Sequence, residues 1–455
     1  MKFTFKKIGF IDSGEVQLGN LTVICGRNNT GKTYVSHSIY GLLKQCSSQR
    51  VSVADSESID QLFSDGECII DAPNISELVA KVSREFSNSS LKDVFNSEED
   101  SFKSGSVTLT VEEECNQKFG LYEKELIVKL GEDSDTELRI KTKNNEHSVT
   151  VNLINPNVSR SFVQYALDKA LSSLILGSFI PNSFVITSER TGSAMFYKDL
   201  DSQAHSILDH IVELKDNKKL NPFSLLQKMR SRYSLPIRSN IESMRYAQET
   251  AKNKSEIFID KEHDYVFKKL RQIVGGTYKT LVNGVYYVPT KKRNRDKVEL
   301  PMHMASSATK SLYLLDLYLR HVAKIGDVLI IDEPELNLHP DAQRTLAQLL
   351  VRIVNTGIKI IITTHSDHLL RELNSLVMLS SPNIDPEDRN DLFSRHGLSV
   401  EDTIAPHKVK AYVNSSSTHK IHEMQVDELG IHMQLFNDEI NKSTDLSKEV
   451  YYLVS

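Results

Sequence analysis

Residues 26–33, which read GRNNTGKT, decide the fold of this 455-residue chain. They satisfy the pattern G-x-x-x-x-G-K-[ST]; an apolar run, LTVIC, precedes them, and a helical pattern to about Leu43 follows. In such a strand–loop–helix, glycines let backbone N–H groups approach phosphate oxygens, and the helix N-terminus adds positive potential. The predicted nucleoside triphosphate site consists of Gly26, Arg27, Asn28, Asn29, Thr30, Gly31, Lys32 and Thr33.

Two residues of this loop have specific expected roles. Lys32 should reach the β- and γ-phosphates, and the hydroxyl of Thr33 should coordinate Mg²⁺. ATP with Mg²⁺ is therefore the expected ligand. A glycine-rich turn with a surface lysine is the alternative interpretation, but the strand and helix on either side favour the phosphate site.

A second run, VLIIDEP at residues 328–334, places two carboxylates at the end of an apolar strand. Ligands of open α/β sheets bind at the carboxyl ends of the strands. Asp332 is therefore expected to hold Mg²⁺ through water, and Glu333 to orient and activate the attacking water. A plain exit from a strand into a turn would look similar, although the P-loop earlier in the chain favours the functional interpretation.

His365 ends a third apolar strand, one helix after the strand that carries Asp332 and Glu333. A lone histidine at a strand end is more often structural. In this position, however, an imidazole N–H is placed to donate a hydrogen bond to the γ-phosphate. We therefore predict that His365 is catalytic together with Glu333.

The hydrophobic pattern predicts an α/β chain with three regions. Residues 1–198 should form an N-terminal ATPase lobe, with a β-meander before the P-loop, a polar surface insertion at about 46–105 and antiparallel hairpins from 106 to 153. Residues 199–275 are charged and helical in pattern, which predicts a helical arm or hairpin, with an ordinary helical lobe as the alternative. Residues 276–455 alternate helices and strands, as in a parallel sheet.

Composition limits the partners of the chain. A net charge of −5 gives no general attraction to nucleic acid or anionic membrane. Two basic clusters, at residues 291–295 and between Lys228 and Arg245, nevertheless leave direct nucleic-acid binding open. No run is apolar enough for a signal peptide or a membrane span, so the expected location is the cytoplasm, without a membrane partner.

The cysteines favour the same compartment. They are far apart in the sequence, without the close pairs of a zinc site or the density of a disulfide scaffold. Free thiols are therefore expected at Cys25, Cys46, Cys68 and Cys115.

Together, the P-loop, IIDEPELNLHP at 330–340 and IITTHSDHLL at 361–370 resemble ABC-type ATPases of the SMC/Rad50/OLD kind. The closest resemblance is to AAA-15-like ATPases of prokaryotic antiphage systems, over about 1–45 and 285–455. It implies an ABC-type P-loop NTPase with an N-terminal antiparallel β lobe, a parallel-sheet core and an inserted helical arm. It also implies that residues 335–340 form a D-loop that contacts a partner subunit across the nucleotide.

The family places a signature motif, usually Leu-Ser-Gly-Gly-Gln/Glu, where this chain has ASSATK at 305–310. The resemblance implies that Ser306 contacts the γ-phosphate of the opposite subunit, so that ATP is enclosed in a homodimer or a higher homo-oligomer. Ser307 and Ala308 replace the glycines and restrict close backbone approach, which favours slow ATP hydrolysis. Ser306 is also a suitable N-cap for the following helix, and both roles can hold.

Arg190 lies in the segment SERTG at 188–192, just after a short apolar strand. Members of this branch often carry an arginine here. The resemblance therefore implies that Arg190 contacts phosphate or the partner subunit. A structural arginine that caps a turn is the alternative.

The resemblance implies an ATP-binding and ATP-hydrolysing sensor and scaffold in antiphage defence. No Toprim-like acidic cluster and no HNH pattern stands out in the sequence, so the toxic effector should be a separate Toprim-like or HNH nuclease, with a phage-encoded trigger. PARIS-type ATPases fit the length and motifs best, and Septu-type ATPases come next. The alternatives are a RecF/Rad50-like DNA-repair ATPase that binds DNA directly, and a weakly hydrolysing nucleotide switch.

Overall fold

The computed structural model describes residues 1–48, 54–71, 74–111, 124–130, 136–142, 148–155, 157–197, 233–281, 284–290 and 298–433. The chain divides into two compact units. The first unit consists of Met1–Gln17 and His37–Ser183, and the second of Leu18–Ser36 and Phe184–Ser455. The P-loop and both strands that carry the other predicted catalytic residues belong to the second unit.

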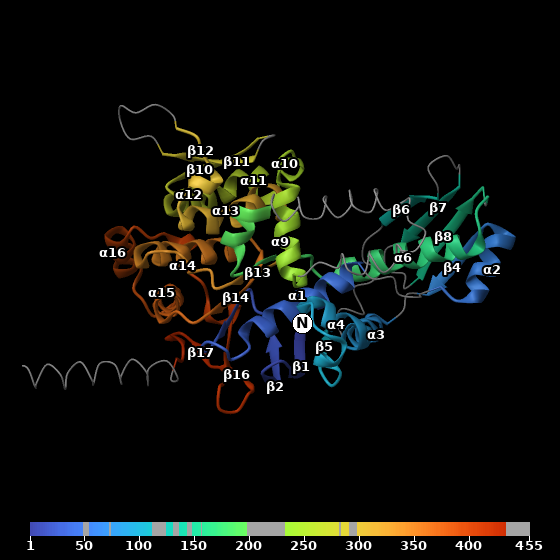
Figure 1. The fold of residues 1–455 in the computed structure, drawn as a ribbon, viewed down its shortest axis with the longest axis horizontal. Coiled ribbons are helices and arrows are strands. Elements are labelled where there is room, and N and C mark those ends of the chain that lie inside the picture. The colour runs from blue at the N-terminus through green and yellow to red at the C-terminus, as the bar shows by residue number, and fades with distance from the viewer. Residues whose placement is uncertain are drawn as a thin grey trace, which may run out of the picture. The chain divides into compact units, whose positions relative to one another are not determined.

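The second unit is built on a six-stranded sheet with the order β16-β15-β3-β14-β13-β9 (Figure 1). Its strands are β3 Leu21–Cys25, β9 Ser183–Ile186, β13 Val328–Asp332, β14 Lys359–Thr364, β15 Val409–Asn414 and β16 Ile421–Met424. The four strands from β15 to β13 are parallel, and β16 is antiparallel to β15. Every residue of β3 and β13 is buried, as expected for parallel strands covered on both faces. The predicted parallel-sheet core is confirmed.

Helices of the second unit surround this sheet. They are α9 Leu235–Arg245, α10 Ala247–Thr250, α11 Glu256–Ile259, α12 Asp264–Val274, α13 Ser307–His321, α14 Pro340–Asn355, α15 Asp367–Met378 and α16 Pro386–His396, and α1 Lys32–Ser48 begins in this unit. Helix α14 packs against β14, α12 and α15. Every residue from 309 to 319 in α13 is buried, so this helix belongs to the core.

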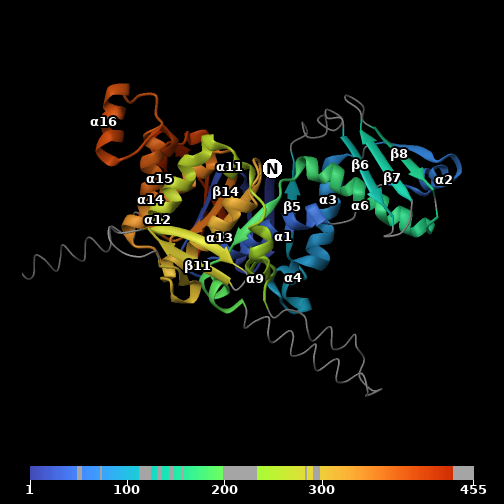
Figure 2. The ribbon, with the colours of Figure 1, turned by 90° about the horizontal axis from the view of Figure 1, so that it is seen from above.

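An antiparallel sheet of three strands completes the second unit (Figure 2). It contains β10 Gly276–Leu281, β11 Gly284–Pro289 and β12 Leu300–Pro301, and β10 contacts α12. Strands β10 and β11 pair as an antiparallel hairpin. A short two-stranded pair, β17 Val426–Asp427 and β18 Gly430–Ile431, lies near the end of the described chain.

The first unit holds two antiparallel sheets. One has the order β2-β1-β5, with β1 Lys2–Ile8, β2 Ile11–Gln17 and β5 Ser106–Thr110. The other has the order β4-β8-β7-β6, with β4 Glu67–Asp71, β6 Lys124–Lys129, β7 Glu137–Thr142 and β8 Ser148–Ile154. The helices are α2 Ser56–Asp65, α3 Ile75–Glu85, α4 Leu91–Phe95 and α6 Arg160–Phe179. The predicted N-terminal antiparallel β structure is confirmed.

Two expectations about these strands were wrong. The meander before the P-loop is only a hairpin of β1 and β2, because β3 leaves it to join the parallel sheet of the second unit. The continuous burial of β3, Thr22 included, fits a central strand and not an edge of a meander. The region 46–105 is also not only a polar surface insertion, because it contains strand β4. Exposed and buried side chains alternate along β4, and its buried residues are Cys68 and Ile70.

Some predictions fall outside the described residues. These include residues 199–232 of the predicted helical arm, the basic cluster at 291–295 and Cys115. From residue 233 onward, the predicted arm region forms α9 to α12. The other three cysteines, Cys25, Cys46 and Cys68, are buried free thiols.

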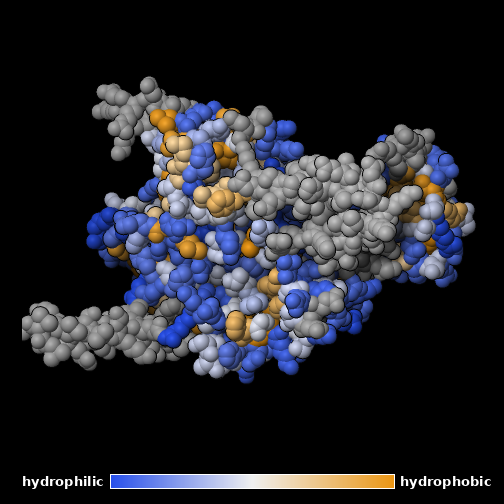
Figure 3. Space-filling model, viewed as in Figure 1, coloured by the Kyte–Doolittle hydropathy of each residue, from blue (hydrophilic) through white to orange (hydrophobic). Residues whose placement is uncertain are grey.

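The surface of the described residues is mainly polar on the face shown in Figure 3, where hydrophobic residues form small separate groups. No helix in the described part of the chain is long and apolar enough to cross a membrane.

Candidate nucleotide site

The P-loop follows β3 directly and contains three residues with positive φ: Gly26 at 155°, Asn29 at 63° and Gly31 at 87°. A Cβ atom at Gly26 would lie 2.6 Å from Oγ1 of Thr30, so no other residue fits there without a shift. Helix α1 begins at Lys32, directly after the loop. The loop therefore leads into a helix N-terminus, as an anion site requires.

Lys32 lies across this loop. Its Nζ donates to the carbonyl oxygens of Gly26 at 3.0 Å and Arg27 at 2.9 Å, and its side chain is buried. Burial lowers the pKa of Lys32, while the nearby carboxylates of Glu333 and Glu335 raise it. An ammonium has three N–H donors, so phosphate oxygens bound in the loop would compete with these two carbonyls for it.

Asp332 is tied to the first turn of α1. Its Oδ1 accepts hydrogen bonds from Oγ of Ser36 at 2.8 Å and from Oγ1 of Thr363 at 3.0 Å. Oγ of Ser36 also donates to the carbonyl oxygen of Thr33 at 3.3 Å. The carboxylate predicted to hold the metal therefore lies beside the helical turn that carries Thr33.

These residues fit Mg²⁺. Thr33 and Asp332 offer a hydroxyl and a carboxylate, which are the oxygen ligands that this ion prefers. In nucleotide sites Mg²⁺ takes only one or two protein ligands and completes its shell with phosphate oxygens and water. Among the described residues, no cluster of three or more His, Cys, Asp or Glu side chains is arranged to hold a metal alone.

The structure brings Glu333 and His365 together. Oε1 of Glu333 lies 3.1 Å from Nδ1 of His365, and both side chains remain partly open to solvent. The backbone N–H of Glu333 donates to the carbonyl oxygen of Thr363 at 3.0 Å, and φ of Glu333 is 45°. A positive φ at a residue with a side chain costs free energy and persists only where surrounding contacts hold it.

Glu335 points inward, beneath this pair. Its Oε1 accepts from Oγ1 of Thr364 at 2.6 Å and lies 3.9 Å from Nδ1 of His365. Its Oε2 is buried and has no hydrogen-bond partner among the described residues. Burial raises the pKa of Glu335. The contact of residues 335–340 with a partner subunit stays a prediction.

Arg190 is placed behind the carboxylate turn. Its Nη1 donates to the carbonyl oxygen of Asp332 at 2.8 Å, and its Nη2 to those of Glu333 at 2.8 Å and Pro334 at 3.3 Å. Burial lowers its pKa to about 10, although the charge of Glu335 opposes that shift. The predicted contact of Arg190 with phosphate or with a partner subunit stays a prediction.

Ser306 is the N-cap of α13. Its Oγ accepts from the backbone N–H of Thr309 at 3.1 Å and lies 2.8 Å from Oγ1 of the same residue. The N-cap expectation is therefore confirmed. Ser306 is also exposed, which leaves its predicted contact with phosphate sterically open.

Three residues of the site were not identified from the sequence. Ser36 lies one helical turn after Thr33, and that spacing is a signal that an analysis of the helix face would have found. Thr363 meets Asp332 because the two are register partners in β14 and β13. Asn414 ends β15 and donates from Nδ2 to the carbonyl oxygen of Thr30 at 3.2 Å, which braces the P-loop.

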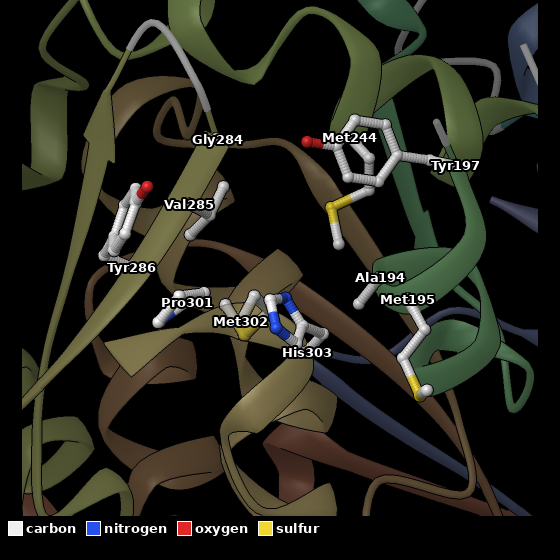
Figure 4. Close-up of a pocket in the computed structure, with 10 residues that line it drawn as sticks. All are labelled: Ala194, Met195, Tyr197, Met244, Gly284, Val285, Tyr286, Pro301, Met302 and His303. Atoms are coloured by element: carbon white, nitrogen blue, oxygen red, sulfur yellow. The ribbon is translucent and has the colours of Figure 1, made fainter. Parts of the chain in front are cut away.

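A separate pocket of about 230 Å³ lies elsewhere in the second unit (Figure 4). Side chains from the helical segment 190–197, α9, β11 and the turn at 301–303 surround it. Its lining residues are Ala194, Met195, Tyr197, Met244, Gly284, Val285, Tyr286, Pro301, Met302 and His303. None of the predicted nucleotide, metal or catalytic residues lines it.

Comparison with known proteins identifies a family. The family model described as AAA ATPase domain (AAA_15) matches residues 8–370. No curated protein matches the chain. Among solved structures, an Smc head domain with an extended coiled coil bound to the C-terminal domain of ScpA, from Pyrococcus furiosus, is 12% identical, with a TM-score of 0.32. The match covers 99% of this chain and 98% of that one.

Two further solved structures are SMC heads. One, bound to the C-winged helix domain of ScpA, is 13% identical over 82% of this chain and 91% of that one, with a TM-score of 0.30. The SMC head domain from Thermotoga maritima is 8% identical over 82% and 90%, with a TM-score of 0.26. TM-scores this low support no inference about function.

The family match spans most of the chain and includes the P-loop, the Asp332–Glu333 turn and His365. The chain therefore belongs to the AAA ATPase domain family.

Proposed function

We propose that this chain binds ATP with Mg²⁺ at the P-loop and hydrolyses it slowly. One observation carries the proposal: Glu333 and His365 meet at 3.1 Å beside Asp332, which Ser36 ties to the P-loop helix. This proximity of the P-loop, the candidate metal ligand Asp332 and the candidate general base Glu333 supports the proposal. Mg²⁺, when bound, would neutralise charge on the phosphates.

Glu333 is the proposed general base. Its carboxylate takes a proton from a water molecule as that water attacks the γ-phosphate, a role typically worth 10²- to 10⁴-fold in rate. His365, with Nδ1 toward Glu333, has Nε2 left to donate to the γ-phosphate. Donation from both ring nitrogens requires the imidazolium form, and the carboxylate oxygens of Glu333 and Glu335 lie 3.1 Å and 3.9 Å from Nδ1.

We further propose that ATP joins two copies of the chain. The exposed Ser306 at the start of α13 would contact the γ-phosphate held by the other copy, and a homodimer or a higher homo-oligomer would form. Hydrolysis would then release the copies. The replacement of the usual signature glycines by Ser307 and Ala308 supports slow turnover, since added side chains limit backbone approach.

The biological role that we propose is that of a sensor and scaffold in antiphage defence, which holds a separately encoded toxic effector and releases it on a phage-encoded trigger. Support comes from the sequence motifs at about 1–45 and 285–455, which resemble those of ATPases in antiphage systems. The effector would be a Toprim-like or HNH nuclease.

Copurification tests this role. The chain and the product of its neighbouring gene are coexpressed and isolated with and without ATP, using the wild type and the Glu333→Gln variant, which should retain ATP. We expect a stable complex whose yield depends on nucleotide, and toxicity of the neighbour when it is expressed alone. Contradiction would come from a neighbour that does not copurify, together with tight binding of the chain to DNA ends that weakens steeply with salt. That outcome would favour a RecF/Rad50-like repair ATPase.

A further inference from the structure

Three successive carbonyl groups converge on one guanidinium. Arg190 donates to the carbonyl oxygens of Asp332, Glu333 and Pro334, and it is only 2% exposed. These carbonyls belong to the turn that aims the Glu333 carboxylate. The bond at 2.8 Å to Glu333 fixes the peptide of the one residue in the turn whose φ is positive.

A second segment of the chain also holds the Arg190 guanidinium in place. The carbonyl oxygen of Thr187 accepts from Nη1 of Arg190 at 3.2 Å. Thr187 is held in turn by Asn240 of α9, whose Oδ1 accepts from the backbone N–H of Thr187 at 3.0 Å and from its hydroxyl at 3.2 Å. Nδ2 of Asn240 donates to the carbonyl oxygen of Val185 in β9 at 2.6 Å. A buried chain of hydrogen bonds thus runs from β9 and α9 to the Glu333 turn.

We propose that Arg190 is a positioning residue for Glu333, which acts on hydrolysis through the backbone of the turn and does not contact the nucleotide. This inference rests on the proposed function. Both terminal nitrogens are already bonded to carbonyl oxygens, and burial leaves no approach for a phosphate. The planar guanidinium can donate to several carbonyl oxygens at once. A lysine ammonium on a flexible stem fits this arrangement poorly.

The expected consequence is a loss of rate with little loss of binding. Without Arg190, Glu333 is free to leave its positive φ, and its carboxylate moves relative to the attacking water. A misplacement of about 1 Å costs roughly 10²-fold in rate. The P-loop is held by bonds of its own, through Lys32 and Asn414, so affinity for ATP should remain.

The test compares Arg190→Gln and Arg190→Lys with wild type. Glutamine keeps an amide donor and removes the buried charge, while lysine keeps the charge and loses the fork. Thr191→Val is the matched control, because Thr191 is the next residue and its hydroxyl accepts from the Asn337 side chain, at 3.3 Å, and not from the Glu333 turn. Each variant is measured for ATP Kd, for single-turnover phosphate release at saturating ATP, and for Tm.

We expect phosphate release to fall roughly 10²-fold in both Arg190 variants, with ATP Kd within about threefold of wild type and Thr191→Val unchanged. In a Glu333→Gln background, Arg190→Gln should cause no further loss.

A tenfold or larger rise in Kd with an unchanged rate would show a phosphate contact and overturn the inference. Unchanged Kd and rate in all variants would also overturn the inference. It would likewise be overturned if the Arg190 variants failed to fold, since the role of Arg190 would then be structural. If wild type itself releases no phosphate above the Glu333→Gln level, the proposed function fails and the inference with it.

Discussion

Lys32, Arg190 and Glu335 are among the charged side chains buried around the Glu333 turn. Burial disfavours the charged form of each, and it lowers the pKa of the two bases and raises that of the acid. The charge of Glu335 raises the pKa of both cations and so opposes the effect of burial on them. Removing one member therefore affects the rest, and substitutions here should not be additive.

Glu335→Gln should change how stability depends on pH. The folded-state pKa of Glu335 is raised above 4.5, so the native chain keeps a proton that the unfolded chain has lost. This carboxyl group therefore lowers the free energy of unfolding as pH rises through the window between 4.5 and the raised value. We expect the stability of Glu335→Gln relative to wild type to increase from pH 4.5 to pH 8, as measured by urea unfolding in EDTA without nucleotide.

The exposed Glu423, which pairs with Lys410, gives the control. Glu423→Gln removes a carboxylate from the surface and is measured alongside Glu335→Gln. The account of Glu335 would be contradicted if Glu335→Gln and Glu423→Gln followed the same curve.

Motifs in the sequence predicted that Glu333 and His365 lie close together, but they gave no signal for residues whose contacts depend on strand pairing. Glu333 and His365 each end an apolar run, and parallel strands bring their carboxyl ends to one edge. Thr363 could not be identified, because its contact with Asp332 depends on the register between β13 and β14, which no local pattern specifies. The hydrogen bonds of Arg190 to this turn could not be identified for a similar reason, since its partners are backbone carbonyls that carry no sequence signal.

At the scale of elements, local sequence signals predict where helices begin and end better than they predict which strands pair. The start of α14 has clear local signals, because Pro340 is its first residue and His339 caps it. Strand β4 was missed because only two of its five residues are buried. The strand before the P-loop was identified, but its sheet was not, since alternation in β1 and β2 gives no information about where β3 pairs.

Helix α13 allows its cap to be separated from its proposed phosphate contact. Ser306→Ala removes the cap and should cost about 1 kcal/mol of stability, whereas Ser306→Asp keeps an N-cap acceptor and should stay within about 0.5 kcal/mol of wild type. The aspartate would, however, place a negative charge against the γ-phosphate of the other copy. We therefore expect Ser306→Asp, in a Glu333→Gln background, to lose ATP-dependent dimers in sedimentation while its urea midpoint is retained. Dimers that persist with ATP would contradict the proposed role of Ser306.

At the scale of the whole molecule, the second unit gathers a site from distant parts of the chain. Ser36 and Asp332 are 296 residues apart in sequence and bond directly. Family membership and the parallel core were both predictable, because the motifs that define them lie in short contiguous runs. The division into two compact units was not, because it depends on which sheet each strand joins.

The most direct test of the central claim is phosphate release by wild type and Glu333→Gln, with ATP Kd measured for both and Lys32→Ala as the binding-deficient reference. We predict that Glu333→Gln binds ATP within about threefold of wild type but releases phosphate at least 10²-fold more slowly. Lys32→Ala should bind no ATP at concentrations that saturate wild type. Equal phosphate release by wild type and Glu333→Gln would contradict the assignment of Glu333 and with it the proposed hydrolysis at this site.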